Sequence, residues 1–252
     1  MSFQNILLIL LSGVASGFMN TVAGGGSLIS MPVLIFLGLP SAVANGTNRV
    51  ALMVQNVVAV ANFKRKGFFD FKLGIMLAIP AVIGAIIGAN FAVNLPDRIF
   101  NNILAVIMII VLGLILWQPQ KKVFAQQEDL TAKRKIIAVI AFFFVGMYGG
   151  FIQAGVGFII IASLTLITGM SLVKINSLKV FIIMLYMSSS LLVFILNGKV
   201  NWLLGFVLAA GNALGAWLGS TFAVAKGDKW IKGVLTIGIL LMAAKLLGIF
   251  SV

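Results

Sequence analysis

A run of glycines interrupts an apolar stretch of the chain near its N-terminus. The run is Gly24-Gly25-Gly26, followed by Ser27, and each glycine disfavours a helix by about 1 kcal/mol relative to alanine. Glycine also lets backbone N–H groups approach an anion closely at the start of a helix. Irregular backbone at membrane depth is tolerated where it is buried in protein or lines a cavity. The run therefore predicts an anion-binding site, with close helix packing as the alternative explanation.

A similar interruption occurs later in the chain, around Gly155 and Gly157, with the polar residue Gln153 just before it. Glycine-interrupted segments at corresponding positions in the two halves of a transporter point to its binding site. We therefore expect the two interruptions to meet at one site. Backbone N–H groups and the side chain of Gln153 would donate hydrogen bonds to the anion there.

Each interruption is followed by a polar segment that carries one cation inside an apolar stretch. The segments are Ala44–Val50, with Arg49, and Ile175–Phe181, with Lys179. At 1.5 Å per residue, both cations lie about 10 Å into a helix, where a cation costs about 2.5–3.5 kcal/mol. All five acidic residues lie in predicted loops and the chain has no histidine, so we expect a ligand anion to supply the partner charge. Snorkelling of both side chains to the nearer interface is the alternative.

The same inventory argues against other chemistry. The predicted spans contain no carboxylate, thiolate or imidazole to bind a metal cation, and no acid–base pair for hydrolysis. We therefore predict no metal site, no cofactor and no enzymatic activity, and a small anion as the ligand. The predicted substrate-binding residues are Gly24, Gly25, Gly26, Ser27, Asn45, Gly46, Thr47, Asn48, Arg49, Gln153, Gly155, Gly157, Asn176 and Lys179.

The composition identifies a lipid bilayer as the environment of these segments. Of the 252 residues, 62% are hydrophobic and 9% are charged, whereas a soluble domain carries about 25% charged residues. The net charge of +13 comes largely from lysines and arginines clustered in short loops, which is typical of cytoplasmic loops and not of a nucleic-acid-binding surface. The chain is predicted to be an all-α polytopic protein of the cell membrane that binds no nucleic acid.

The chain also matches itself at an offset of 131 residues. Asn45 then aligns with Asn176, and the GAIIG of Gly84–Gly88 aligns with the GAWLG of Gly215–Gly219. A constant offset over most of the chain predicts two homologous halves. The predicted division is residues 1–117 for the first transmembrane repeat, 118–135 for a cytoplasmic linker and 136–252 for the second repeat.

Each half is expected to contain a glycine-broken pair of helices followed by three full spans. A short segment follows each break, and it either spans the membrane or re-enters it. Counted as a re-entrant pair, each half crosses an odd number of times, so the halves would have inverted topology with both termini outside; parallel halves are the alternative. The predicted helices are 3–22, 27–39, 42–63, 72–94 and 99–117, then 136–153, 158–169, 172–196, 201–224 and 230–250.

These motifs resemble the TauE/SafE family of sulfite and organosulfonate exporters. The resemblance rests on Gly24-Gly25-Gly26-Ser27 and Pro32, then Asn45-Gly46-Thr47-Asn48 at the start of the next span, with a degenerate copy in the second half. In that copy, Gly155-Val156-Gly157-Phe158 lacks one glycine and the serine, and Lys179 is particular to this sequence. The resemblance covers nearly the whole chain. It implies transport of sulfite, sulfoacetate or related organosulfonates across the prokaryotic cell membrane by alternating access.

The function predicted from the residues and the resemblance together is transport of small sulfur-containing anions. Two alternatives stay open at this point. One is a carrier for other small organic or inorganic anions, such as carboxylates, and the other is a channel-like pore. The sequence is compatible with both a monomer and a homodimer.

Overall fold

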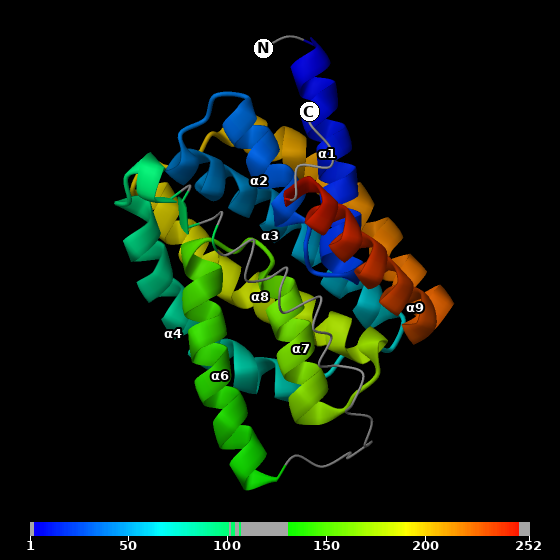
Figure 1. The fold of residues 1–252 in the computed structure, drawn as a ribbon. Helices are drawn as coiled ribbons and strands as arrows, with labels where there is room; N and C mark the ends of the chain where they lie inside the picture. Colours follow the sequence, from blue (N-terminus) through cyan, green and yellow to red (C-terminus); the bar gives the residue numbers. More distant parts are fainter. Residues whose placement is uncertain (1–2, 101, 104–105, 107–130, 247–252) are drawn as a thin grey trace.

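The computed structural model describes residues 3–100, 102–103, 106 and 131–246, which form helices joined by short loops (Figure 1). The prediction of an all-α membrane protein is confirmed, since five of the described helices are long and apolar enough to cross a bilayer. Most of the predicted helix 99–117 and most of the linker 118–135 lie outside the described residues. The helices are α1 (Phe3–Val22), α2 (Ser27–Phe36), α3 (Ser41–Arg65), α4 (Phe71–Val93), α6 (Ala132–Phe151), α7 (Val156–Thr168), α8 (Leu172–Leu196) and α9 (Trp202–Leu246).

The 131-residue repeat recurs in the helix bounds and in the turns. Helices α3 and α8 have the same length of 25 residues and begin and end at corresponding positions. Glycines with positive φ also occur in pairs at this offset: Gly24 and Gly155, Gly38 and Gly169, and Gly67 and Gly198. The predicted boundary between 224 and 230 is confirmed, because α9 consists of two helices that meet at a kink, where Gly227 has non-helical φ of 72° and ψ of −169°.

Helices of one half pack along helices of the other half. Helix α1 of the first half lies along α9 of the second, and α6 of the second half lies along α4 of the first (Figure 1). Small residues permit this contact, because a Cβ atom at Gly17 would overlap the backbone of Asn212, and one at Gly150 would overlap that of Ala85. Glycine at these positions is therefore explained by close helix packing. The inverted orientation of the halves in the membrane stays a prediction.

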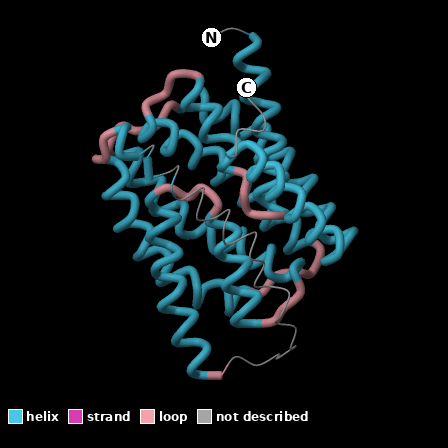
Figure 2. Tube along the Cα trace, in the orientation of Figure 1, coloured by secondary structure: helices cyan, strands magenta, loops and turns pink. Residues whose placement is uncertain are grey.

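Helices α2 and α7 are too short to cross a membrane. They contain 10 and 13 residues, or about 15 and 20 Å, against a hydrocarbon core of about 30 Å. The loops that precede them, 23–26 and 152–155, lie inside the molecule (Figure 2). Both predicted interruptions are therefore real breaks, buried at the centre of the fold.

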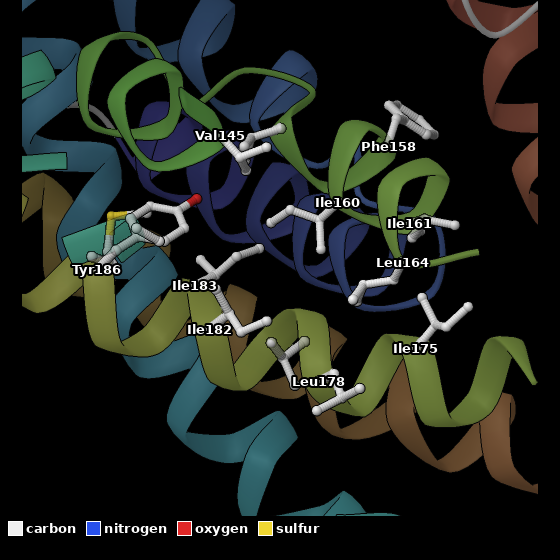
Figure 3. Packing of buried hydrophobic residues seen from close by; sticks show 14 of the residues in the cluster. Val145, Phe158, Ile160, Ile161, Leu164, Ile175, Leu178, Ile182, Ile183 and Tyr186 are labelled. Atoms are coloured by element: carbon white, nitrogen blue, oxygen red, sulfur yellow. The ribbon is translucent and has the colours of Figure 1, made fainter. Parts of the chain in front are cut away.

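The interior around α7 and α8 is apolar. Buried aliphatic side chains of α7 face those of α8 (Figure 3), with Tyr186 further along α8. This packing is continuous with the main hydrophobic core and holds α7 against α8 within the second half. The facing residues are Ile160, Ile161 and Leu164 of α7 and Ile175, Leu178 and Ile182 of α8.

Candidate functional site

The two glycine breaks meet in the structure, as the sequence predicts. A Cβ atom at Gly24 would overlap the backbone of Gly157, and one at Gly157 would overlap the backbone of Gly24. Gly24 also has φ of +94°, a conformation that side chains other than glycine rarely adopt. Only glycine fits at Gly24 and Gly157, because the two segments of the chain are in backbone-to-backbone contact there.

Two helix N-termini converge on this contact, because α2 begins at Ser27 and α7 begins at Val156. The first bonds of α2 are donated by Leu28 to the carbonyl of Gly25 (3.1 Å) and by Ile29 to that of Gly26 (2.9 Å). Among the backbone hydrogen bonds of the described residues, none is donated by the amides of Gly25 and Gly26. Unpaired N–H groups at a helix N-terminus carry partial positive charge and bind anions.

Gln153 lies in the second break with its side-chain amide unpaired. The residue is buried, and it is the one described non-glycine residue with positive φ, at 59°. Neither its Nε2 nor its Oε1 makes a hydrogen bond within the protein. The loop itself is held by Tyr148, whose hydroxyl donates to the carbonyl of Ala154. A strained backbone and an unpaired buried amide together are typical of a ligand-binding position.

Arg49 of α3 reaches the C-terminal end of α6. Its Nη1 donates to the carbonyl of Gly149 (3.3 Å) and to Ser190 Oγ (2.7 Å), and its Nη2 donates to the carbonyl of Gly150 (2.5 Å). The guanidinium also lies 4.4 Å from the centre of the Phe194 ring. The fully buried side chain thus joins α3 to α6 and α8, and its Nε alone makes no bond within the protein.

Lys179 of α8 reaches the C-terminal end of α1 in the same way as Arg49 reaches that of α6. Its Nζ donates to the carbonyls of Asn20 (2.8 Å) and Thr21 (2.9 Å) and to Asn176 Oδ1 (2.7 Å). An ammonium has three donors, so all the donors of Lys179 are used. The neighbouring Asn176 donates to the carbonyl of Val22 at 2.9 Å, the last residue of α1.

Each half therefore places a cation against the broken helix of the other half. Cations are favourable at helix C-termini, where unpaired carbonyl groups carry partial negative charge. Because no acidic side chain lies in the predicted spans, the sequence predicts that a ligand anion supplies the counter-charge. The structure instead provides backbone carbonyls as partners for Arg49 and Lys179. Neither side chain snorkels, because both are fully buried and bonded in the interior.

The other residues of the first polar segment make contacts across the same region. Asn45 donates to the carbonyl of Phe151 (2.8 Å), and the hydroxyl of Thr47 accepts from the amide of Asn201 (2.9 Å). Gly46 has no room for a side chain, because a Cβ atom there would overlap the carbonyl of Lys199. Asn48 accepts from Ser30 at 2.7 Å, while its Nδ2 makes no bond within the protein. Of the predicted amide side chains, Asn48 and Gln153 thus keep unpaired donors, as Arg49 does at Nε.

Sequence reasoning missed two acidic residues that hold the cation-bearing helices. Asp97 accepts from the backbone amide of Ser41 (3.0 Å) at the start of α3, and Asp228 accepts from that of Val173 (3.4 Å) at the start of α8. The sequence predicts loops for both aspartates and no role for either one. Their alignment at the 131-residue offset was the available signal, since equal positions in two halves indicate an equal function.

Comparisons with known proteins agree with this architecture. The family model described as sulfite exporter TauE/SafE matches residues 9–246. A probable membrane transporter protein of Haemophilus influenzae is 26% identical over 234 residues, covering 93% of this chain and 91% of the relative. The probable membrane transporter protein YfcA of Escherichia coli is 30% identical over 235 residues, with 92% and 86% covered. No solved structure matches the chain.

The family match spans almost the whole chain, and the relatives align over nearly their full length. It includes both glycine breaks and both cation-bearing helices, and five described helices are able to span a membrane. The chain is therefore a multi-pass membrane transporter, not an enzyme, and it belongs to the TauE/SafE sulfite exporter family.

Proposed function

We propose that the protein transports small sulfur oxyanions, sulfite or organosulfonates such as sulfoacetate, and binds them where the two glycine breaks meet. The observation that carries the proposal is the set of unpaired donors at that contact. Among the described residues, the backbone amides of Gly25 and Gly26 donate no recorded hydrogen bond, and the side-chain amide of Gln153 is unpaired. A sulfonate or sulfite group presents several acceptor oxygens on one sulfur, which suits a cradle of N–H groups at helix N-termini.

The two buried cations contribute charge to this site more than direct contacts. Each helix C-terminus offsets about half a unit charge, whereas Arg49 and Lys179 each bring a full one. The surplus adds to the partial positive charge at the starts of α2 and α7, and in a low-dielectric interior it attracts an anion. Arg49 Nε is the one cationic donor left for a direct bond.

The same arrangement supports alternating access as the mechanism that we propose. In transporters built from repeats, one repeat rocks against the other around a fixed site near the midplane. Here the site is made of both breaks, and each break is tied to a long helix of the other half through Arg49 or Lys179. Relative movement of the halves would therefore open the site to one side or the other while the cradle stays assembled.

The test is an anion titration of the purified protein, followed by its thermal stability, with sulfite, sulfoacetate, sulfate and carboxylates. We expect sulfite or sulfoacetate to raise the melting temperature with saturation, since a ligand that binds only the folded state stabilises it. Gln153→Met should weaken that binding by about tenfold or more, because it removes a hydrogen bond to a charged group worth about 1.5–3 kcal/mol.

Thr165→Val is the matched control. Thr165 is also buried, but its hydroxyl donates to the carbonyl of Ile161 within α7, at 2.7 Å. Its replacement should leave the anion affinity unchanged. Saturable stabilisation by carboxylates in place of sulfur oxyanions would overturn the substrate class. Unchanged affinity in a folded Gln153→Met protein would overturn the location of the site.

A further inference from the structure

One face of α3 carries a row of buried polar side chains that the proposed site does not use. The row follows the helical spacing of i, i+7, i+8 and i+14, so its members lie on one side of the helix. It begins beside the glycine break and ends at Asn62, two residues before the basic pair Lys64 and Arg65. We call it the polar face of α3, and its members are Asn48, Gln55, Asn56 and Asn62.

Partners on α9 extend this row across the helix interface. Asn212 donates to Gln55 Oε1 at 3.1 Å, and Asn62 donates to Ser220 Oγ at 2.7 Å and to Thr221 Oγ1 at 2.9 Å. From Asn48 to Asn62, the polar face is about 21 Å long at 1.5 Å per residue. It therefore covers more than half of a hydrocarbon core of about 30 Å.

Helix packing alone does not account for these residues. Polar side chains that join membrane helices are paired with one another, as Asn62 is with Ser220. In contrast, Asn48 Nδ2, Gln55 Nε2, Asn56 Oδ1 and Asn212 Oδ1 make no hydrogen bond within the protein, although their side chains are fully buried. Each unpaired buried group costs about 1–3 kcal/mol, so a face with several of them needs water or a ligand as a partner.

We propose that the polar face of α3 is the route by which the anion reaches the glycine breaks from the end of α3 that bears the basic residues. This inference rests on the proposed function and names its access path. Polar residues inside a membrane mark the paths of substrates and ions. The unpaired donors Asn48 Nδ2 and Gln55 Nε2 hold the anion, while the unpaired acceptors Asn56 Oδ1 and Asn212 Oδ1 accept from the water that travels with it. The absence of charge on the face lets the anion leave each position. By the positive-inside rule the basic end is cytoplasmic.

Cysteine accessibility tests the route without any substrate, and the chain has no native cysteine. The probe is a small anionic methanethiosulfonate reagent applied to membrane vesicles of either orientation. Asn56→Cys and Asn62→Cys are the variants on the polar face, and Lys66→Cys in the basic loop reports the side of that loop. Met187→Cys and Val193→Cys on α8 are the matched controls, because they occupy the corresponding positions in the second half.

We expect Asn56→Cys and Asn62→Cys to react from the same side as Lys66→Cys, at least about tenfold faster than the α8 controls, because thiol reactivity follows exposure to water. Rates no faster than those of the controls, or reaction from the opposite side, would overturn the route. If Asn62→Cys does not fold, Gln55→Cys supplies the second position. Because the assay uses no substrate, its failure leaves anion binding at the breaks to be judged by the titration alone.

Discussion

Helices α3 and α8 are two copies of one element that differ along one face. Both contain 25 residues, both have a first-turn amide that donates to an aspartate, and both place a cation at the end of a broken helix in the other half. Beyond the cation the copies diverge. Where α3 has Gln55, Asn56 and Asn62, α8 has Tyr186, Met187 and Val193.

The divergence is large enough to change how the helices suit a membrane. Helix α8 is a candidate span, with mean hydropathy of 2.2 over its most apolar window, whereas α3 is not among the candidate spans of the described residues. Duplication therefore kept the contact that assembles the fold and changed the face beside it. In our proposal, the cations that both helices carry hold the site together. The polar face, which only α3 has, is the path of the anion to the site.

Arg49→Ala should have the largest effect, because it removes the cation with the most partners. The carbonyls of Gly149 and Gly150 would lose their donors in a buried region, and breaking a buried charged contact costs about 3–5 kcal/mol. We expect a marked fall in the melting temperature of the purified protein and loss of anion binding. Arg49→Lys should recover part of the stability, because α8 uses a lysine for the same purpose. A wild-type melting temperature for Arg49→Ala would contradict the shared role.

Lys179→Met should have the same kind of effect at a smaller size. Lys179 makes three hydrogen bonds and no contact with an aromatic ring is recorded for it among the described residues. A cation at a partly buried helix C-terminus contributes up to about 2 kcal/mol. The free energy of unfolding should fall by about that amount, measured in detergent against Arg49→Ala. A larger loss of stability than for Arg49→Ala would contradict this ranking, since it would make the contact of Lys179 the stronger of the two.

Much of this fold could be predicted from residue types and spacing. The apolar segments fixed the helix bounds 3–22 and 172–196 without error, because the length of a span is set by the bilayer. The glycine runs predicted the breaks, because few other features interrupt a helix at membrane depth. The charged residues around Gly227 likewise predicted a helix boundary, and the chain kinks at that glycine.

The partners of the buried cations could not be predicted in the same way. Residue types reveal charged side chains, but they do not reveal the partial charges of backbone carbonyls at a helix end. Arg49 finds its partners about a hundred residues away in the sequence, which depends on how the halves interlock. The unpaired amide of Gln153 was within reach of sequence reasoning, because a polar side chain beside a glycine break has few partners nearby.

Asn56→Met tests the difference between the copies, because it gives α3 the residue that α8 has at this position. Asn56 Oδ1 is buried and unpaired, so its removal relieves a desolvation cost. We expect stability to stay the same or to rise by about 1 kcal/mol, while transport in reconstituted vesicles falls. Thr165→Val again serves as the control and should transport normally. Normal transport by a correctly inserted Asn56→Met protein would contradict a role for the polar face.

The smallest effect is expected from pH, and it tests a property that α3 and α8 share. Neither helix contains an aspartate, glutamate or histidine, and all five acidic residues of the chain lie outside both. Neither copy can therefore carry a proton on a carboxylate or an imidazole, and the buried cations are held by carbonyl groups.

Transport of a sulfonate, which stays ionised throughout the neutral range, should be independent of pH in vesicles without a membrane potential. Sulfite changes its own protonation in that range and should show a pH effect that follows its ionisation. Counterflow of each substrate at matched internal and external pH separates the two cases. A steep pH dependence for the sulfonate, abolished by replacing Asp97 or Asp228 with asparagine, would show that the aspartates at the starts of α3 and α8 take part in coupling.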